Sequence, residues 1–218
     1  MENNIVISFI IPAHNSEKFL KRCVESVVKE EKQPKDNNLA EVIIIENGSS
    51  DHTKQIGTAL AEKYENVFLI CSEKGVSNAR NAGVKAAHGE WIFFLDADDY
   101  LPAGTLQKLL DTVNSGKAAD LYIFSYEKGN AIVNVATGEN ADGYEGTGVR
   151  ECLAGMLRNP TRCMAVWGKL FRHSIIQQSS LDFNKKLSLA EDSDFLIRYI
   201  IKCGRIIFSQ ESCYHYST

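Results

Sequence analysis

The chain has 218 residues, of which 44% are hydrophobic and 24% charged, a balance typical of a globular protein with one sizeable core. Its net charge of −4 at pH 7 argues against non-specific nucleic-acid binding, which needs basic surfaces. The longest apolar runs have the length of a strand, well short of the ~18 residues of a membrane-spanning helix. Six cysteines without a CxxC pair, and an N-terminus without a signal-peptide pattern, predict a cytoplasmic protein with reduced thiols.

Strand-like and helix-like segments alternate through the first half of the chain. A β-branched run predicts a buried strand at Ile5–Ile11, ended by Pro12, and the apolar spacing from Phe19 to Val28 predicts a helix capped by Asn15 or Ser16. Further strands are expected at Val42–Ile45, Val67–Cys71, Trp91–Leu95 and Leu121–Tyr126, and further helices over the segment that carries Ile56, Leu60 and Tyr64, at Ser77–His88 (ended by Gly89) and at Thr105–Asn114.

This alternation predicts an α/β fold, with a mostly parallel sheet flanked by helices. The carboxyl ends of parallel strands share one edge of a sheet, and ligands bind outside that edge. Three polar loops follow predicted strands and are expected to meet there: His14-Asn15, Glu46–Asp51 and Asp96–Asp99.

The second half is less regular. Thr137–Gly148, with four glycines, is expected to be a loop or linker. An earlier polar stretch, Lys32–Asn38, leads to the second predicted strand. A helix at Val149–Arg158, a tryptophan-containing segment at Met164–Phe171, a helix from about Ala190 to Cys203 and a strand at Arg205–Ser209 are expected to pack against the first sheet and close one side of its ligand site.

Asp96, Asp98 and Asp99 place three carboxylates within four residues at the end of a predicted strand. Residues i and i+2 of an extended segment point the same way, so Asp96 and Asp98 can face one site. Such oxygen ligands suit Mg²⁺ or Mn²⁺. The alternative is a solvated acidic turn in which Asp99 caps the following helix.

Two further segments could bind a nucleotide. Glu46 and Asn47 could read the polar edge of a base, with Ser50 or Asp51 capping the next helix; otherwise they form an ordinary loop. Arg80, in the first turns of a predicted helix, could pair with phosphate oxygens. Otherwise Arg80 is a surface charge and Asn81 makes a hydrogen bond from the helix to a loop.

The C-terminal half offers a base and an aromatic surface. Glu191-Asp192 begins a predicted helix, where the acidic residues either complement the helix dipole or supply a general base. Trp167 is either a core aromatic or a wall on which a sugar ring stacks. His215 is either a metal ligand or an ordinary near-surface histidine.

Taken together and in order, five segments resemble family 2 glycosyltransferases with the GT-A fold, over nearly the whole chain. They are Val6–Asn15, Glu46–Asp51, Gly75–Gly83, Gly89–Asp99 and Glu191-Asp192. The sequence differs from the family at two places: His14 stands where tyrosine is frequent, and Glu46-Asn47 stands where two aspartates, or asparagine with aspartate, are common.

The resemblance implies a nucleotide-diphospho-sugar donor, most often a UDP-sugar, and a divalent Mn²⁺ or Mg²⁺. It assigns Asp98, with Asp96, to the metal, and Asp192, with Glu191 as second choice, to the catalytic base. The implied donor-binding residues are Pro12, Ala13, His14, Asn15, Glu46, Asn47, Asp51, Arg80, Asp96 and Ala97.

The resemblance further implies one GT-A domain over residues 1–218, with a nucleotide-binding half (1–126) and an acceptor-side half (137–218). Transfer to a glycan or lipid-linked hydroxyl would invert the anomeric centre, as in polysaccharide biosynthesis. A lipid-linked acceptor would bring the protein to the cytoplasmic face of the membrane. Relatives often continue beyond the position of Thr218, so the chain is either a fragment or a minimal enzyme.

Two other functions compete with this interpretation. A catalytically silent GT-A module would bind a glycan or a partner without reaction; the carboxylates at Asp96–Asp99 and Glu191-Asp192 argue against it. A sugar nucleotidyltransferase would carry a glycine- and arginine-rich loop after the first strand, where this chain has Pro-Ala-His-Asn.

Overall fold

The computed structural model describes residues 5–29, 39–135 and 143–217. The strands are β1 (Ile7–Ala13), β2 (Ala40–Glu46), β3 (Val67–Cys71), β4 (Trp91–Phe94), β5 (Leu121–Lys128), β6 (Ala131–Val133), β7 (Tyr144–Glu145), β8 (Lys169–Arg172) and β9 (Arg205–Tyr216). The helices are α1 (Leu20–Val28), α2 (Thr53–Lys63), α3 (Val76–Ala86), α4 (Thr105–Asn114), α5 (Gly148–Arg158), α6 (Pro160–Cys163), α7 (His173–Gln178) and α8 (Glu191–Ile200).

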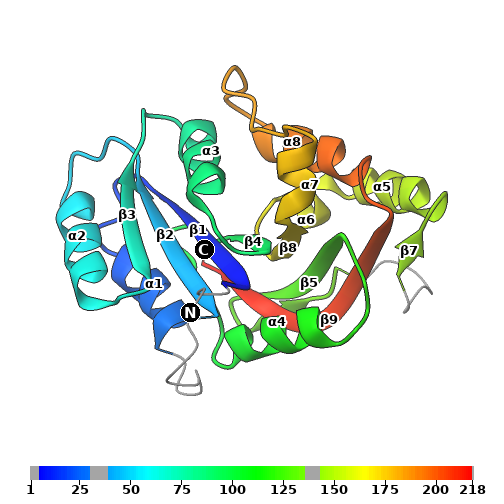
Figure 1. Ribbon diagram of the computed structural model, residues 1–218, viewed down its shortest axis with the longest axis horizontal. Helices are drawn as coiled ribbons and strands as arrows, with labels where there is room; N and C mark the ends of the chain where they lie inside the picture. The colour runs from blue at the N-terminus through cyan, green and yellow to red at the C-terminus, as the bar shows by residue number, and fades with distance from the viewer. Residues whose placement is uncertain (1–4, 30–38, 136–142, 218) are drawn as a thin grey trace.

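The strands form one mixed sheet in the order β3-β2-β1-β4-β8-β5-β9-β7, with β6 paired to β5. The first four are parallel neighbours, so their carboxyl ends share one edge. Helices cover both faces: α3 and α8 lie above the sheet in Figure 1, and α1 and α4 lie below it. The α/β fold with a helix-flanked central sheet is therefore as predicted.

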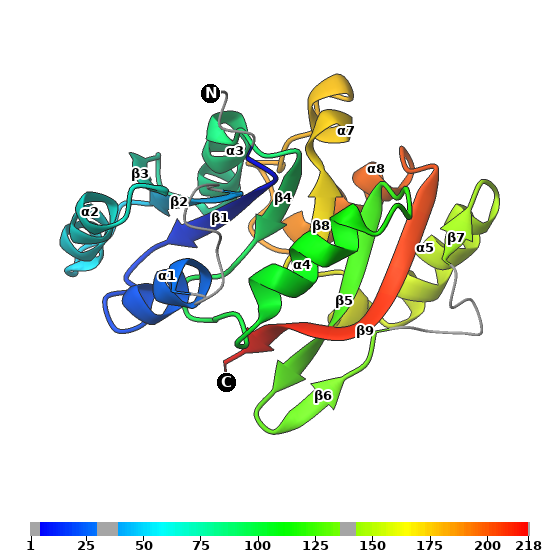
Figure 2. The same cartoon turned by 60° about the horizontal axis from the view of Figure 1, so that its bottom comes forward.

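The second half of the chain enters this sheet. β8 runs antiparallel between β4 and β5, and β9 pairs in parallel with β5. β9 continues well past the predicted end at Ser209, because register shifts opposite Phe124–Glu127 let it bend and keep pairing. Figure 2 shows this long, bent strand crossing in front of β5, with α4 on the near face of the sheet.

Pro12 does not end the first strand, contrary to the prediction. β1 continues to Ala13, which is aligned with Glu46 of β2. The carbonyl of Ile10 accepts the Leu95 N–H on the β4 side, whereas that of Ala13 accepts the Asn47 N–H on the β2 side. Strand residues alternate sides, so Pro12 faces the β4 side, where β4 has already ended at Phe94. No ladder hydrogen bond is lost there, and proline is tolerated.

The predicted start of α1 also needs correction, whereas the structure decides between the two residues predicted to cap α2. α1 begins at Leu20, without a side-chain cap, and Asn15 instead adopts a left-handed conformation with φ of 50°. At α2, the Asp51 carboxylate rather than Ser50 accepts the Thr53 N–H, at 2.9 Å. The stretch Lys32–Asn38 and the first half of the predicted loop Thr137–Gly148 lie outside the described residues, and the described half of that loop contains β7.

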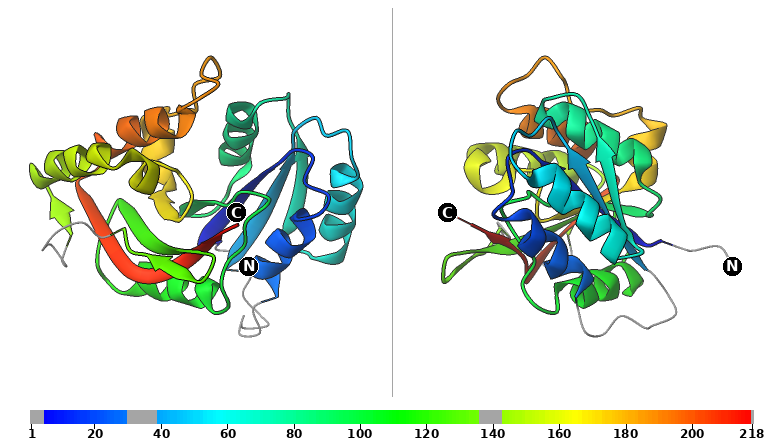
Figure 3. Two further views of the ribbon diagram at one scale, coloured as in Figure 1. Left: turned by 180° about the vertical axis from the view of Figure 1, so that it is seen from behind. Right: turned by 90° about the vertical axis from the view of Figure 1, so that its left-hand side faces the viewer.

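Aromatic side chains fix the spacing between β4 and α8. Phe183 and Phe195 stack with ring centroids 4.1 Å apart, and Phe94 meets both rings edge-on. Phe94 precedes Asp96 by two residues, and Phe195 follows Asp192 by three, so this cluster lies next to the predicted site. The segment between α7 and α8 projects from the body at the top of Figure 3 (left), with Leu189 82% exposed.

The six cysteines all lie within the described residues. None of them forms a disulfide bond, and only Cys71 is exposed. Across residues 5–29, 39–135 and 143–217, no helix is long and apolar enough to span a membrane.

Gly89 is required by close packing and not by a helix end. α3 ends earlier, at Ala86, and a Cβ on Gly89 would lie 2.6 Å from the Ser8 backbone nitrogen. We therefore expect Gly89→Ala to lower the free energy of unfolding by about 2–3 kcal/mol, because backbone would have to move. Urea denaturation measures this. Gly155→Ala is the matched control: within the described chain its Cβ would meet nothing within 4 Å, so helix propensity predicts a gain of up to about 1 kcal/mol.

Candidate active site

The loops after β1 and β2 are joined by hydrogen bonds. His14 Nδ1 lies 2.9 Å from the Asn47 carbonyl oxygen, and Asn15 Oδ1 accepts the Ser50 N–H at 2.9 Å. The Asn15 N–H donates to the Ser49 hydroxyl at 3.1 Å. The structure thus brings together two of the three polar loops that the sequence places at this edge. Pro12 and Ala13 form the last positions of β1 beside them.

Three of the predicted donor-binding side chains also accept hydrogen bonds from backbone N–H groups at this edge of the sheet. Glu46 Oε1 accepts the Ser49 N–H at 2.6 Å; burial opposes ionisation of Glu46, but the hydrogen bonds from Ser49 outweigh it and lower its pKa. Asn47 Oδ1 accepts the Gly75 N–H at 2.8 Å, which ties this loop to the start of α3. Asp51 Oδ2 accepts the Glu17 N–H at 3.1 Å. These carboxylates and amides are held in fixed orientations before any ligand is considered.

Arg80 is the centre of the carboxylate cluster. Its guanidinium, only 4% exposed, donates to Asp192 Oδ1 at 2.5 Å, to Glu191 Oε1 at 3.2 Å and to Asp96 Oδ1 at 3.4 Å. It is therefore not the surface charge of the alternative interpretation. A single cation from α3 connects the end of β4 to the first turn of α8.

Burial and Arg80 act in opposite directions on these acids. Burial raises the pKa of Asp96 above its ordinary value, and the Arg80 charge limits that rise. The same holds for Asp192, whose pKa is raised by burial and lowered by Arg80 and by the Val166 N–H. The nearby Asp96 and Glu191 charges raise it further. A buried carboxylate with a raised pKa is a better proton acceptor than an exposed one.

The Asp96–Asp99 turn contains acids with different environments. Asp99 is buried, and its carboxylate accepts the Tyr214 hydroxyl and the Ser217 N–H. It does not cap α4, which begins at Thr105 after Gly104. Asp98 is exposed, and within the described residues its carboxylate has no hydrogen-bond or ion-pair partner. Asp99 thus anchors the end of β9, whereas Asp98 is available to a ligand.

The residues present fit a divalent cation in part. Asp98 and Asp96 offer the hard oxygen ligands that Mg²⁺ and Mn²⁺ prefer, and one Asp96 oxygen already faces Arg80. No group of three or more His, Cys, Asp or Glu side chains in the described part of the chain is arranged to hold a metal. A cation here would need further oxygens from a diphosphate and water, which is usual for Mg²⁺.

Trp167 and His215 both make aromatic contacts near the end of β9, but on opposite faces of the strand, because Tyr214 and His215 are consecutive strand residues. The Trp167 ring stacks on Tyr214 at 4.6 Å between centroids and meets Tyr126 edge-on at 4.8 Å. It remains half-buried, so its role as a sugar wall stays a prediction. His215 stacks on Tyr100 at 4.2 Å, with Nδ1 3.1 Å from Glu127 Oε2.

Several groups near the cluster are missed by sequence reasoning. The Val166 N–H donates to Asp192 Oδ2 at 3.2 Å, and the Tyr214 hydroxyl lies against both Asp99 and the Asp96 N–H. No local pattern predicts either contact, because the partners are far apart in the sequence. The alternative for Asn81 is confirmed: its side chain bonds both the N–H and the carbonyl of Phe183.

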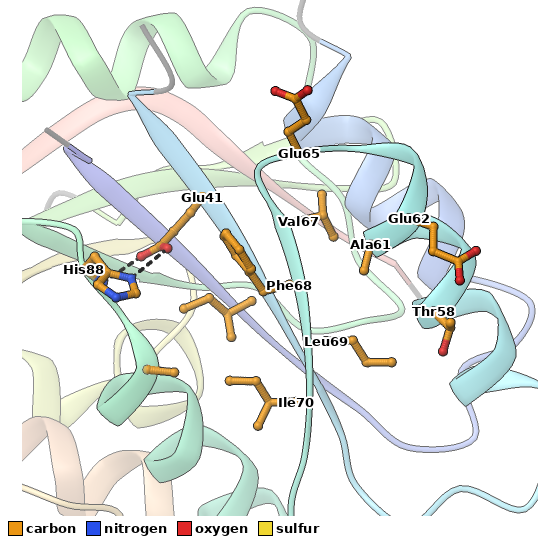
Figure 4. Close-up of a pocket in the computed structure, with 12 residues that line it drawn as sticks. Glu41, Thr58, Ala61, Glu62, Glu65, Val67, Phe68, Leu69, Ile70 and His88 are labelled. Atoms are coloured by element: carbon orange, nitrogen blue, oxygen red, sulfur yellow. Dashed lines mark hydrogen bonds and ion pairs between the residues drawn. The ribbon is translucent and has the colours of Figure 1, made fainter. Parts of the chain in front are cut away.

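A hollow of about 570 Å³ lies elsewhere, beside β3 at the edge of the sheet (Figure 4). Its only buried carboxylate, Glu41, accepts the Ser8 hydroxyl at 2.6 Å and lies 3.1 Å from His88 Nδ1. Glu41 is thus already engaged, and none of the predicted site residues lines the hollow. It is lined by Glu41, Ile43, Thr58, Ala61, Glu62, Glu65, Val67, Phe68, Leu69, Ile70, Ala86 and His88.

Comparison with known proteins assigns the family. Residues 8–177, most of the chain, match the sequence model of Glycosyl transferase family 2. The chain belongs to this family. The match includes the β1, β2 and α3 segments and the Asp96–Asp99 turn, and ends before α8.

Two curated glycosyltransferases align with almost the whole chain. Poly(ribitol-phosphate) beta-glucosyltransferase of Bacillus spizizenii is 28% identical over 216 residues, which cover 96% of this chain and 32% of the relative. Poly(ribitol-phosphate) beta-N-acetylglucosaminyltransferase TarS of Staphylococcus aureus is 26% identical over 219 residues, which cover 97% of this chain and 35% of TarS. The chain therefore spans about a third of the length of these two relatives.

Solved structures of other proteins share the fold. The structure of S. aureus TarS 1–349 in complex with UDP matches with a TM-score of 0.77 at 23% identity, covering 98% of this chain and 61% of that chain. The mannosyltransferase PcManGT from Pyrobaculum calidifontis, in complex with GDP-Man and Mn²⁺, matches with a TM-score of 0.66 at 18% identity, covering 99% of this chain and 57% of that chain. The predicted GT-A fold is confirmed.

The carboxylates around Arg80 predict that the free energy of unfolding depends on pH in a variant that lacks this arginine. Arg80→Met leaves three carboxylates without their cation, so at pH 7 we expect the free energy of unfolding to fall by about 3–5 kcal/mol. The pKa values of Asp96 and Asp192, already raised, rise further in the variant. The native state then binds more protons than the unfolded state, and the variant gains stability as the pH is lowered from 8 to 5.

Chemical denaturation at several pH values measures this effect. Arg198→Met is the control, because Arg198 pairs with the partly exposed Asp194 and should cost about 1 kcal/mol or less. An Arg80→Met loss of equal size at every pH from 5 to 8 would contradict the prediction.

Proposed function

We propose that this family 2 glycosyltransferase transfers a sugar from a nucleoside-diphosphate sugar, with a UDP-sugar as the first choice of donor. The acceptor is a hydroxyl group of a glycan or a lipid-linked molecule, and the transfer inverts the anomeric centre. The observation that carries the proposal is the Arg80 cluster, which places Asp96 beside Glu191 and Asp192. Metal-site and base candidates from segments about 90 residues apart in the sequence thus face one another at the carboxyl edge of the sheet.

The donor would lie over the loops after β1, β2 and β4. Pro12, Ala13, His14 and Asn15 would form one wall for the nucleoside, with Glu46 and Asn47 facing its base. The lowered pKa keeps Glu46 ionised at neutral pH, so it can accept a base N–H but cannot donate to a carbonyl. Ala97, beside Asp96, is proposed as a further residue on the donor side, and it is buried in the structure. The structure of TarS in complex with UDP, which shares this fold, supports a uridine nucleotide as part of the donor.

The diphosphate leaving group needs positive charge. A divalent Mn²⁺ or Mg²⁺ held by Asp98 and Asp96 would stabilise the negative charge on the leaving phosphate. The structure of PcManGT in complex with GDP-Man and Mn²⁺ supports a divalent metal in a glycosyltransferase of this fold. Arg80 holds the carboxylates in register; its direct contact with the diphosphate or base remains a prediction.

Asp192 would accept the proton of the attacking hydroxyl. An alcohol is a weak nucleophile at neutral pH, and a carboxylate on the opposite face of the sugar from the leaving group can take its proton. Asp192 Oδ1 is held by Arg80 and Oδ2 by the Val166 N–H, so its orientation is fixed. One base and one in-line displacement give an inverted product. Glu191, in the same first turn of α8, is the second choice.

The acceptor and setting follow from the relatives. Both curated relatives are named for transfer to poly(ribitol-phosphate), which supports a polyhydroxylated surface polymer or its lipid-linked precursor as acceptor. Half-buried Trp167, next to Val166, would stack against a sugar ring. We propose that residues 1–218 act as one domain, on the cytoplasmic side, with contact to the membrane surface where the acceptor is lipid-linked.

The metal assignment predicts a specific loss of donor binding. UDP with Mn²⁺, at 100 times its Kd, should raise the melting temperature by about 5–10 °C. We expect Asp98→Ala to abolish the part of the shift that depends on Mn²⁺. Asp111→Ala, an equal charge change at an exposed position on α4, should leave it intact. If the thermal shift of Asp98→Ala still depends on Mn²⁺, Asp98 is not a metal ligand. The same screen with GDP, CDP and dTDP identifies the nucleobase of the donor.

The base assignment predicts a loss of rate without loss of binding. Asp192→Asn should leave the UDP thermal shift unchanged and slow the release of UDP from UDP-sugars by about 100-fold or more, because no carboxylate accepts the proton. Asp194→Asn, in the same turn of α8, is the matched control and should retain activity. Release within a few-fold of the unsubstituted protein would show that Asp192 is not the base. UDP binding without any sugar release in the unsubstituted protein would favour the silent binding module.

A further inference from the structure

Lys169 is a buried cation next to the proposed base. It is the first residue of β8 and is 3% exposed. Its ammonium group donates to the Ala165 carbonyl oxygen at 2.7 Å and to the Trp167 carbonyl oxygen at 3.3 Å. Among the described residues it has no carboxylate within ion-pair distance. A buried lysine without a counter-ion is unusual and costly, which indicates a role beyond packing.

The two carbonyls lie on either side of Val166, whose N–H holds Asp192. The Ala165 carbonyl and the Val166 N–H belong to the same peptide group. On one side of this group is the Lys169 ammonium, and on the other is Asp192 Oδ2, 3.2 Å from the Val166 nitrogen. A continuous line of hydrogen bonds therefore runs from the ammonium through one planar peptide to the carboxylate.

We propose that Lys169 is a positioning residue for Asp192 and acts through the Ala165–Val166 peptide group. A cation on the carbonyl oxygen polarises the amide and makes its N–H a stronger donor. It also fixes the peptide plane, because the same ammonium group holds the carbonyls on both sides of Val166. This inference rests on the proposed function for its catalytic meaning; the link between Lys169 and Asp192 does not depend on which reaction the protein catalyses.

Other charged groups contribute at both ends of the line. Asp192 faces Arg80 from α3, Asp96 from the loop after β4, and Glu191 from its own helix. Lys169 faces Asp192 and the Cys163 thiol of α6. Burial lowers the pKa of Lys169 to about 8, against the opposing charges of Cys163 and Asp192. The ammonium is therefore the charged form at neutral pH and is lost in mildly alkaline solution.

A purely structural lysine would hold the 165–167 turn without affecting the carboxylate. The distinguishing measurement is the ¹³C resonance of the Asp192 carboxyl group in the full chain, assigned by its absence in Asp192→Asn. Its titration is compared in the unsubstituted protein, Lys169→Met and Lys169→Gln. Lys108→Met is the control, because it removes the same charge from an exposed lysine that pairs with Glu211.

Removing the cation destabilises the ionised carboxylate, so we expect the Asp192 pKa to rise by at least about half a pH unit in Lys169→Met. The rise should be smaller in Lys169→Gln, whose neutral amide can still donate. Lys108→Met should leave the pKa unchanged. A folded Lys169→Met protein with an unchanged Asp192 pKa would overturn the proposal.

The unsubstituted protein supplies a second test if neither lysine variant folds. As Lys169 loses its proton in mildly alkaline solution, the Asp192 resonance should show a second inflection. An Asp192 resonance that is flat through this range would also overturn the proposal.

Kinetics separate this proposal from the proposed function. With UDP-GlcNAc as the probe and UDP release as the readout, Lys169→Met should lower kcat about 10-fold and leave KM for the donor unchanged. In the Asp192→Asn background the same substitution should have no further effect. Full activity in Asp192→Asn would refute the base assignment alone, whereas equal losses from Lys169→Met in both backgrounds would refute the link to Asp192.

Discussion

The ion-pair cluster around Arg80 is the constraint on which the rest of the site depends. One buried guanidinium holds Asp96, Glu191 and Asp192, which come from opposite halves of the chain. Removing three carboxylates from water is costly, and only a shared cation with several donors offsets that cost. The loops after β1 and β2 have their own hydrogen bonds, but the distance between β4 and α8 is set by Arg80 above and by the stacked Phe183 and Phe195 beside it. The end of β4 and the first turn of α8 are thereby kept in register.

Much of the fold could be predicted because its signals are local. The apolar runs of β1 to β4 and the apolar spacing of α4 identified these elements, and the alternation of strand and helix indicated the α/β class. The errors have physical causes. Pro12 was expected to end β1, but the neighbouring strand had already ended, so its missing N–H cost nothing. Gly89 was expected at a helix end, but it is needed where the backbone of Ser8 passes closely. Both outcomes depend on partners far away in the sequence.

The residues of the candidate site could be selected from the sequence, but most of the contacts between them could not. Residue type and place after a strand selected Asp96, Asp98 and Glu46, and the structure brings Asp96 together with Glu191 and Asp192. Spacing already favoured Asp98 over Asp99 as a ligand, but it could not predict that the Tyr214 hydroxyl and the Ser217 N–H hold Asp99. Nor could it identify Lys169 or the Val166 N–H, because a lysine in an apolar strand and a backbone amide carry no motif. Long-range contacts decide which polar groups remain available for chemistry.

The position of β8 has a consequence for synthesis and folding. Between β4 and β5 the sheet is completed by residues 169–172, which leave the ribosome more than 70 residues after β4. Until then β4 is an unpaired edge with four buried apolar residues, the kind of surface that pairs with other chains. Pairing over this sequence separation is slow to form, since a long loop must close first. The protein is therefore most exposed to aggregation, and most in need of chaperones, during synthesis, after the N-terminal half has emerged and before β8 pairs with β4.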